Sequence, residues 1–441
     1  MNLALDNITI EQAFDLAVQA HKSGVSKRSE EICLEILKVR PDHLQTLYLV
    51  GSICLDTGDY NKAYGYFSNI IDVAPDIAHA YVYSGAALEK LSRNDEAIGK
   101  LKIALQINPN LHNAWFFLGN ALLSIDLLNE AVECYQKAIS LKENFPEAHY
   151  NLGLIFEILG QTEKSISGYQ YVIQQKPDHI GALFNLHAAY YRDADLPKAM
   201  ECLKKALKIS PENKKIRFFV GMLHDYTGNT EVAFDQFNWL LNKKGEIYLQ
   251  CWEYIKSLKP GLPRLFGYTS DGLFLGCQAA SITGLNLEFG VRSGVSIRQI
   301  AAHIDQDIHG FDSFQGLPES WHELSVGEYT TQGVLPEIPD NVQLHVGLFE
   351  ESLPAFLEKH SGPVRFMNVD CDLYSSTVTI FEILNERIVP GTVIIFDEYI
   401  ANPHWQDDEF KAFQEAVETY GWRYDYLAIS LYSKQAIVVI R

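Results

Sequence analysis

The sequence predicts two architectures in one chain, a solenoid of paired helices followed by a doubly wound α/β domain. Three observations support this: a strict 34-residue period up to about residue 247, the loss of that period afterwards, and alternating strand-like and helix-like segments from about residue 285 onward. A chain of 441 residues, 47% of them hydrophobic, is long enough for more than one core. We expect a solenoid over residues 1–247, a capping helix or linker over 248–264, and the α/β domain over 265–441.

The 34-residue period is carried by three sets of equivalent positions. A proline ends the second helix of each unit, and small residues let the two helices of a unit cross closely. Three sets with one period do not arise by chance from amphipathic helices. The sets are Pro41, Pro75, Pro109, Pro177 and Pro211; Gly51, Gly85, Gly119, Gly153 and Gly221; and Ala63, Ala97, Ala131, Ala199 and Ala233, with Glu143, His187 and Ser165 as the respective exceptions.

The segment AWFFLGNALLSIDLLNEAVECYQKAISLKEN and its counterparts resemble the tetratricopeptide repeat, with frames that begin near residues 9–11 and continue to about residue 247. The resemblance implies a superhelix whose concave groove holds a protein or peptide partner. Asn151 and Asn185 occupy one position in consecutive repeats, on the helix that by resemblance lines the groove. They could bind a peptide backbone through their amides, but solvated positions on an exposed face are the favoured interpretation.

The composition argues against several classes of function. The formal net charge of −20 is unsuited to nucleic acid or to an anionic membrane surface. No apolar run approaches the roughly 20 residues of a spanning helix, and the stretch MNLALDNITIEQAFDLA lacks the apolar segment of a leader. Seven scattered cysteines without a CxxC pair indicate neither a disulfide scaffold nor a zinc site, and they fit a reducing, cytoplasmic location.

Strand-like and helix-like segments alternate in the second half of the chain. This alternation predicts a doubly wound, mostly parallel sheet, and such sheets bind ligands at the carboxyl ends of their strands. Pro260, Gly261 and Pro263 mark the break between the two halves. The expected strands span residues 285–290, 308–314, 341–347, 365–370, 391–397, 424–432 and 435–441, and the expected helices span 296–303, 376–386 and 409–420.

A glycine-containing turn follows the first of these strands, in the segment LEFGVRSGVSIRQIA. Gly290 and Gly294 allow the backbone to approach a ligand closely, and the helix starting at Ser296 offers free N–H groups. The turn alone is a weak signal, because it lacks the third glycine of a dinucleotide fingerprint. Asp312 ends the next strand roughly 20 residues later, where an acid binds ribose hydroxyls or caps a turn. Together the two features favour nucleoside binding.

Carboxylates follow two of the expected strands: Asp370 and Asp372 after one, Asp397 and Glu398 after the other. Unpaired buried carboxylates are costly, so we expect these acids at an open strand end, where something cationic or protonated meets them. Three acids at adjacent strand ends suit a hard cation such as Mg²⁺. Alternatively, the first pair caps the following helix and the second pair lies in solvent.

Five segments in this order, LEFGVRSGVS, GFDSFQGLPESW, HVGLFEESLPAFL, VDCDLYSST and GTVIIFDEY, resemble the macrocin O-methyltransferase-like family of class I S-adenosylmethionine-dependent methyltransferases. The resemblance covers about residues 265–425 and implies a seven-stranded Rossmann-like fold. It also implies methyl transfer to a hydroxyl, commonly of a sugar, with a divalent cation. The residues it places around the cofactor are Glu288, Gly290, Gly294 and Ser296 at the methionine part, Asp312 at the ribose, and Gly347, Phe349 and Glu350 at the adenine.

By the same resemblance Asp370, Asp397 and Glu398 hold Mg²⁺, which would position the acceptor hydroxyl and lower its pKa. Glu398 departs from the family's usual second aspartate. The related catechol-type enzymes carry a lysine three residues after the first acid, where this chain has a leucine. The base is then Asp372, His404 or Asp370 itself, with Asp372 preferred, unless Asp372 only caps the helix that follows.

The sequence therefore predicts a cytosolic, metal-assisted O-methyltransferase that uses S-adenosyl-L-methionine and acts on a hydroxyl of a sugar or glycan. The repeat array would recruit the substrate carrier or a protein partner. Two alternatives stay open: a repeat scaffold with a degenerate methyltransferase fold, and a methyltransferase that modifies a protein side chain fed along the groove. The intact glycine turn and the strand-end acids favour an enzyme. A homo-oligomer is compatible with the sequence.

Overall fold

The computed structural model describes residues 8–243, 246–258 and 261–441. The chain forms two compact units, Met1–Ile155 and Phe156–Arg441. The first residues of the N-terminal stretch considered above, and Pro260 at the expected linker, lie outside the described residues. None of the described helices is both long and apolar enough to cross a bilayer. All seven cysteines are buried free thiols.

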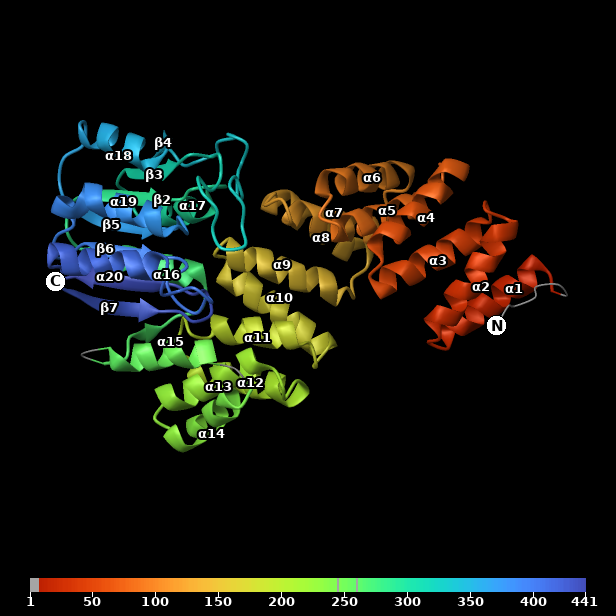
Figure 1. Cartoon of the computed structure of the whole chain (residues 1–441), viewed down its shortest axis with the longest axis horizontal. Helices are drawn as coiled ribbons and strands as arrows, with labels where there is room; N and C mark the ends of the chain where they lie inside the picture. The colour runs from red at the N-terminus through yellow and green to blue at the C-terminus, as the bar shows by residue number, and fades with distance from the viewer. Residues whose placement is uncertain (1–7, 244–245, 259–260) are drawn as a thin grey trace. The chain divides into compact units, whose positions relative to one another are not determined.

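Paired helices with a constant spacing make up the N-terminal part (Figure 1). The first helices of the pairs begin at residues 10, 44, 78, 112, 146, 180 and 214, and the second helices at 26, 60, 94, 128, 162, 196 and 230. Both series keep the 34-residue spacing, which confirms the repeat period. The helices are α1 (Ile10–Lys22), α2 (Ser26–Val39), α3 (Leu44–Thr57), α4 (Tyr60–Val73), α5 (Ala78–Lys90), α6 (Asn94–Ile107), α7 (His112–Leu123), α8 (Leu128–Leu141), α9 (Pro146–Ile158), α10 (Thr162–Gln175), α11 (Ile180–Ala189), α12 (Leu196–Ile209), α13 (Lys214–Tyr226) and α14 (Thr230–Leu241).

The glycine positions exist because a large side chain of the second helix lies against the first helix. A Cβ atom added at Gly119 would lie 2.8 Å from the ring of Tyr135, sixteen residues later. Such a contact is shorter than van der Waals packing allows, so a side chain here would push the two helices apart. The exception, His187, is fully buried and packs its ring against Phe184 and Phe219.

The two equivalent asparagines contribute to contacts within the array. Asn151 donates a hydrogen bond to the Tyr135 hydroxyl over 3.1 Å, and Asn185 donates one to the Tyr169 hydroxyl over 3.2 Å. The two tyrosines are themselves one period apart. The expectation that both asparagines are solvated is wrong for Asn185, which is only 8% exposed, because the preceding repeat covers it.

The C-terminal domain is built on one sheet with the strand order β1-β7-β8-β6-β5-β2-β3-β4 (Figure 1). Strands β4, β3, β2, β5 and β6 are parallel to one another, and β8 runs antiparallel to β6 and β7. The expected doubly wound fold is confirmed, with the two-residue β1 as an eighth strand beside β7. The strands are β1 (Arg264–Leu265), β2 (Leu285–Phe289), β3 (Ile308–Asp312), β4 (Val342–Val346), β5 (Val364–Val369), β6 (Val393–Phe396), β7 (Tyr424–Ile429) and β8 (Ala436–Ile440).

Helices cover both faces of this sheet. Helices α16 and α17 contact each other over one hydrophobic cluster, and α18, α19 and α20 pack in sequence over the other. Two of them, α16 and α18, were not among the expected helices. The helices are α16 (Thr269–Ala279), α17 (Val295–Ala301), α18 (Phe349–Leu357), α19 (Tyr374–Leu384), the 3-10 turn Asn385–Arg387, and α20 (Glu409–Tyr420).

The later repeat helices share a core with the sheet in the second unit. Helix α15 (Glu246–Ser257) buries Trp252, whose indole N–H donates to Asp225 over 2.8 Å. The Tyr268 hydroxyl donates to the Asn185 carbonyl over 3.0 Å. A Cβ atom at Gly267 would lie 2.1 Å from the Ala188 carbonyl oxygen, so only glycine permits this approach. The domain bounds at residues 247 and 264 remain predictions.

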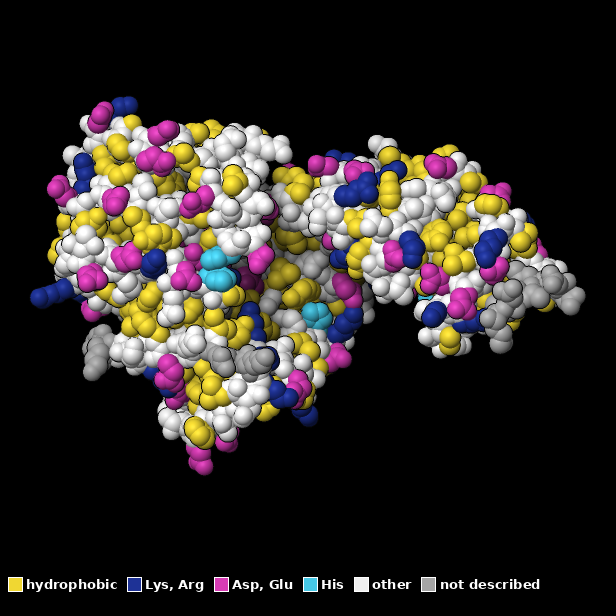
Figure 2. Space-filling view, in the orientation of Figure 1, with side chains coloured by type: hydrophobic (Ala, Val, Ile, Leu, Met, Phe, Trp, Pro, Cys, Tyr) yellow, Lys and Arg dark blue, Asp and Glu magenta, His cyan; other side chains and the backbone are white. Residues whose placement is uncertain are grey.

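On the face shown in Figure 2, Lys and Arg side chains are interspersed with Asp and Glu side chains.

Candidate active site

A cavity of about 530 Å³ opens at the carboxyl ends of the central parallel strands. The backbone N–H of Asp370 donates to the Phe289 carbonyl over 2.9 Å, and that of Asp397 donates to the Val369 carbonyl over 3.0 Å. These bonds continue the strand pairing by one residue, so both acids leave adjacent strands at the same edge. Among the described residues that line the cavity, Arg292 is the only lysine or arginine. The acids lining the cavity are Asp312, Glu319, Glu350, Asp370, Asp372, Asp397 and Glu398.

The glycine turn lies directly against the end of β5. Gly290 has a φ of +92°, and a Cβ atom there would lie 1.7 Å from the Asp370 carbonyl oxygen. No side chain fits at that distance, so glycine is required for this turn. Gly294 adopts the left-handed conformation at the start of α17, but its missing Cβ faces Pro336 and it does not line the cavity.

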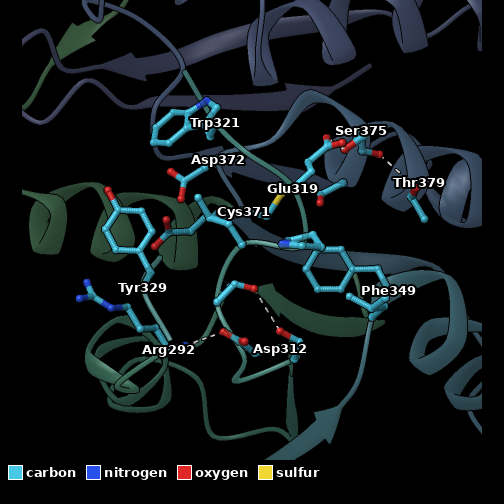
Figure 3. Close-up of a pocket in the computed structure, with 18 of the residues that line it drawn as sticks. Arg292, Asp312, Glu319, Trp321, Tyr329, Phe349, Cys371, Asp372, Ser375 and Thr379 are labelled. Atoms are coloured by element: carbon cyan, nitrogen blue, oxygen red, sulfur yellow. Dashed lines mark hydrogen bonds between the residues drawn. The ribbon is translucent and has the colours of Figure 1, made fainter. Parts of the chain in front are cut away.

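Asp312 lines the cavity, and its side chain also closes a turn. Its carboxylate accepts a hydrogen bond from the backbone N–H of Arg292 over 2.7 Å (Figure 3). It accepts another from the backbone N–H of Phe314 over 2.6 Å. The first bond joins the glycine turn to the end of β3. The carboxylate is thereby fixed at the cavity edge, and its binding of ribose stays a prediction.

Glu288 and Ser296 lie beneath the turn and outside the cavity lining. The fully buried Glu288 accepts hydrogen bonds through Oε1 from the Ser296 hydroxyl and, over 3.2 Å, from Asn368. Burial raises the pKa of Glu288 to about 8, with Asp312 and Asp397 adding and the two hydrogen bonds opposing. Its Oε2 has no hydrogen-bond partner among the described residues. A buried orphan oxygen beneath a glycine turn fits a donor group supplied by a ligand.

Five carboxyl groups influence one another at the ends of β5 and β6. Burial, followed by the charge of Asp397, raises the pKa of Asp370 well above its usual range. Burial, with Asp397 and Glu398 adding, raises the pKa of Asp372 to about 7, and burial with Glu398 raises that of Asp397 to about 6. Burial also raises the pKa of Glu409, whose Oε1 accepts from the Cys371 N–H over 3.4 Å. Such perturbed groups in a cleft are typical of functional sites.

In the structure, a lysine and a glutamine contact two of the acids that were expected to hold Mg²⁺, and the metal site stays a prediction. Lys434 Nζ lies 3.0 Å from both carboxylate oxygens of Glu398, and Gln435 donates a hydrogen bond to Asp397. The described residues contain no group of three or more His, Cys, Asp or Glu side chains placed to hold a metal ion. Lys434 and Gln435, in the loop before β8, therefore place a positive charge and a hydrogen-bond donor at the end of β6. No step proposed below depends on a cation.

Asp372 does not cap the helix that follows it. The N-cap of α19 is Leu373, without a side-chain capping bond, and Asp372 itself has a φ of +62°. Figure 3 shows its carboxylate between the rings of Trp321 and Tyr329. His404 is exposed outside the cavity lining and stacks on another histidine at 3.9 Å between ring centroids. Of the candidate bases, Asp372 combines a place in the cavity with a pKa of about 7.

The connection between β3 and β4, residues 313–341, forms one wall of the cavity. None of the site residues predicted from the sequence lies in this segment. Trp321 exchanges backbone hydrogen bonds with Leu324, and His322 lies 2.8 Å from Asp408 at the start of α20. The Arg292 guanidinium lies 4.9 Å from the ring centroid of Tyr329. The length of this loop and its aromatic residues are the sequence features that point to a functional role for it.

Comparisons with known proteins agree with both halves of the fold. Residues 287–399 match a family model described as a methyltransferase domain. Residues 51–112, 128–160 and 146–179 match models described as tetratricopeptide or TPR repeats. No curated protein sequence is significantly similar to the chain.

Several solved repeat structures are similar in part. The MamA protein is 25% identical, with a TM-score of 0.33 over 39% of this chain and 94% of its own. A thermophilic TPR protein of Thermus thermophilus is 19% identical, with a TM-score of 0.36 over 41% of this chain and 98% of its own. A tetratricopeptide repeat protein from Parabacteroides merdae is 15% identical, with a TM-score of 0.42 over 53% of this chain and 92% of its own.

The repeat helices at a 34-residue spacing, the doubly wound sheet and the matched family models lead to one assignment. The chain is a fusion of an N-terminal tetratricopeptide repeat array with a C-terminal methyltransferase domain.

Proposed function

We propose that the chain is an S-adenosylmethionine-dependent O-methyltransferase for a hydroxyl of a sugar or glycan, and that its repeats recruit the substrate carrier or a protein partner. The acid-rich cavity in the methyltransferase domain carries the proposal. Seven acids and one arginine line it, and the cofactor bears a sulfonium and an ammonium group. A cleft lined by one sign of charge attracts a ligand of the opposite sign.

Residues of three strand ends would hold the cofactor. The Gly290 turn lines the cavity and would contact its methionine part, and the orphan Oε2 of Glu288 lies beneath that turn. Asp312 would face the ribose, and Phe349, which packs edge-on against Phe289 at 5.4 Å between centroids, would offer an apolar wall for the adenine. When bound, S-adenosylmethionine supplies an electrophilic methyl group on its sulfonium.

Asp372 would take the proton from the acceptor hydroxyl. A carboxyl group with a pKa of about 7 is partly ionised at neutral pH, yet basic enough to accept a proton during transfer. Trp321 and Tyr329 flank it and would exclude water from the reacting oxygen (Figure 3).

A saccharide acceptor suits the outer part of the cavity. The hydroxyl-bearing Ser375, Ser376 and Thr379 lie there with Glu319, and Trp321 supplies an aromatic surface. Ser375 donates to the Glu319 carboxylate over 2.5 Å, so the lining already forms hydrogen bonds of the kind that sugar hydroxyls make. An aromatic ring beside such groups binds the apolar face of a sugar ring.

Calorimetric titration with S-adenosylmethionine tests the cofactor assignment. The wild type should bind in the micromolar range, and Gly290→Val should abolish binding, because its side chain cannot fit beside the Asp370 carbonyl. Gly99→Val is the control, since a Cβ atom there meets no atom within 4 Å. Absence of binding by the wild type, or unchanged binding by Gly290→Val, would overturn the assignment.

A further inference from the structure

A second cavity of about 420 Å³ lies within the second unit, where repeat helices face the methyltransferase domain. The repeats contribute Glu157, Phe184 and Lys215, and the loop between β7 and β8 contributes Tyr432. Asp397 lines this cavity as well as the first one. The end of β6 is therefore the common wall of the two cavities.

Two of the three charged side chains in this lining already have partners. Glu157 accepts hydrogen bonds from the hydroxyls of Tyr169 over 2.7 Å and Tyr432 over 2.9 Å. Burial raises the pKa of Glu157 to about 7, so its charge is partly neutralised at neutral pH. Asp397 accepts a hydrogen bond from Gln435. Both acids are thus satisfied by the protein.

Lys215, the third charged residue, has no such partner. Its Nζ lies 4.9 Å from the ring centroid of Phe184 and 5.9 Å from that of Tyr432. No described carboxylate forms an ion pair with it. Its side chain lines the cavity and is accessible to solvent. Its pKa is lowered by burial and then by the charge of Lys434, and no acid opposes that shift. The ammonium group of Lys215 is therefore the one charged group of this lining without an ion-pair or hydrogen-bond partner among the described residues.

We propose that this cavity is a second acceptor subsite, where Lys215 binds an anionic group, a carboxylate or a phosphate, of the saccharide that is methylated in the first cavity. The proposal rests on the proposed function and narrows its substrate to acidic saccharides. An ammonium group is a strong donor to carboxylate or phosphate. Because Asp397 lines both cavities, the two sites lie next to each other at the end of β6. The repeat array thus supplies a specificity residue to the methyltransferase site.

The experiment measures the binding of three sugars by calorimetry: D-glucuronate, D-glucose 1-phosphate and neutral D-glucose. At least one anionic sugar should bind about 10-fold or more tightly than glucose, as expected for a charge-assisted hydrogen bond. Whichever of the two anionic sugars binds more tightly shows whether the cavity prefers a carboxylate or a phosphate. Equal binding of all three sugars, or no binding of either anion, would overturn the proposal.

Variants of Lys215 test whether this preference for anionic sugars arises in the second cavity. Lys215→Met should abolish the preference and Lys215→Arg should keep it, because arginine retains the charge. Lys142→Met is the matched control: it also removes a lysine from above an aromatic ring, 4.5 Å from the Phe145 centroid, but lies outside the cavity. A preference unchanged in Lys215→Met, or a fall of several degrees in its Tm, would show that Lys215 only supports the fold.

S-Adenosylmethionine binding, measured on the same samples, separates the two proposals. Cofactor binding without anion preference overturns the subsite alone. Anion preference without cofactor binding overturns the methyltransferase function and leaves an anion-binding cavity.

Discussion

Replacing Asp372 by asparagine is expected to abolish the acid limb of the pH–rate profile. The carboxyl has a pKa of about 7, so about half of it is ionised at pH 7 and about a tenth at pH 6. The turnover rate of the wild type should therefore fall roughly tenfold per pH unit below about pH 6.5. Asparagine cannot accept the proton, and kcat should fall about 10²- to 10⁴-fold.

The same substitution should stabilise the protein at alkaline pH. The folded state holds the Asp372 proton to a higher pH than the unfolded chain does, so this group reduces the free energy of unfolding as pH rises from about 4 through about 7. The shift from 3.8 to about 7 corresponds to about 4 kcal/mol, which partial exposure reduces to about 1–2 kcal/mol. Asp372→Asn should recover this amount at pH 8.

The assay combines methyl-transfer rates between pH 5.5 and 9 with thermal unfolding at pH 8, with pH values chosen to bracket a pKa of about 7. Asp407→Asn serves as the control, because that side chain is 72% exposed and lies outside the cavity lining. A structural aspartate would lose stability on substitution, whereas a base loses activity and gains stability. A surviving acid limb in Asp372→Asn, or a rate equal to that of the wild type, would refute the assignment.

Two further predictions follow from the charges. Chelation with EDTA should change the methyl-transfer rate by less than about twofold, because Lys434 already neutralises Glu398. A loss of activity that added Mg²⁺ restores would show that the enzyme needs the predicted cation. Burial, with His345 and His360 adding, lowers the pKa of His309 to about 4, so the unfolded chain binds a proton before the folded one does. The free energy of unfolding should then decrease as pH falls from about 6.5 toward 4, and His309→Gln should flatten this dependence in thermal scans; an equally steep curve in the variant would contradict it.

The repeat array was predictable because its information is local. One 34-residue unit recurs, and four of its glycines, Gly51, Gly85, Gly119 and Gly221, each lie against a large side chain sixteen positions later. Helix α20 begins at Glu409, as the sequence indicated. Helices α16 and α18 were missed because the first contains Gly272 and Gly276 and the second contains Pro354, which weaken a helical pattern.

The site was predictable only in part, because its chemistry depends on tertiary contacts. Glu409 is an acid in the first turn of a helix by sequence, yet the fold buries it beside the strand-end acids. Lys434 lies in a short loop with no motif, and only the antiparallel turn of β7 and β8 brings it to Glu398. The cation is predicted from the acids and from the family resemblance, and neither reveals that Lys434 lies beside Glu398.

The most direct test of the account is transfer of a labelled methyl group from S-adenosylmethionine by the full chain to a fractionated pool of oligosaccharides, lipid-linked saccharides and proteins. The Asp372→Asn variant serves as the blank. We predict label in a saccharide fraction with the wild type and about 10²-fold less or lower with the variant. Label confined to protein, or no label in any fraction that differs from the blank, would contradict a saccharide O-methyltransferase.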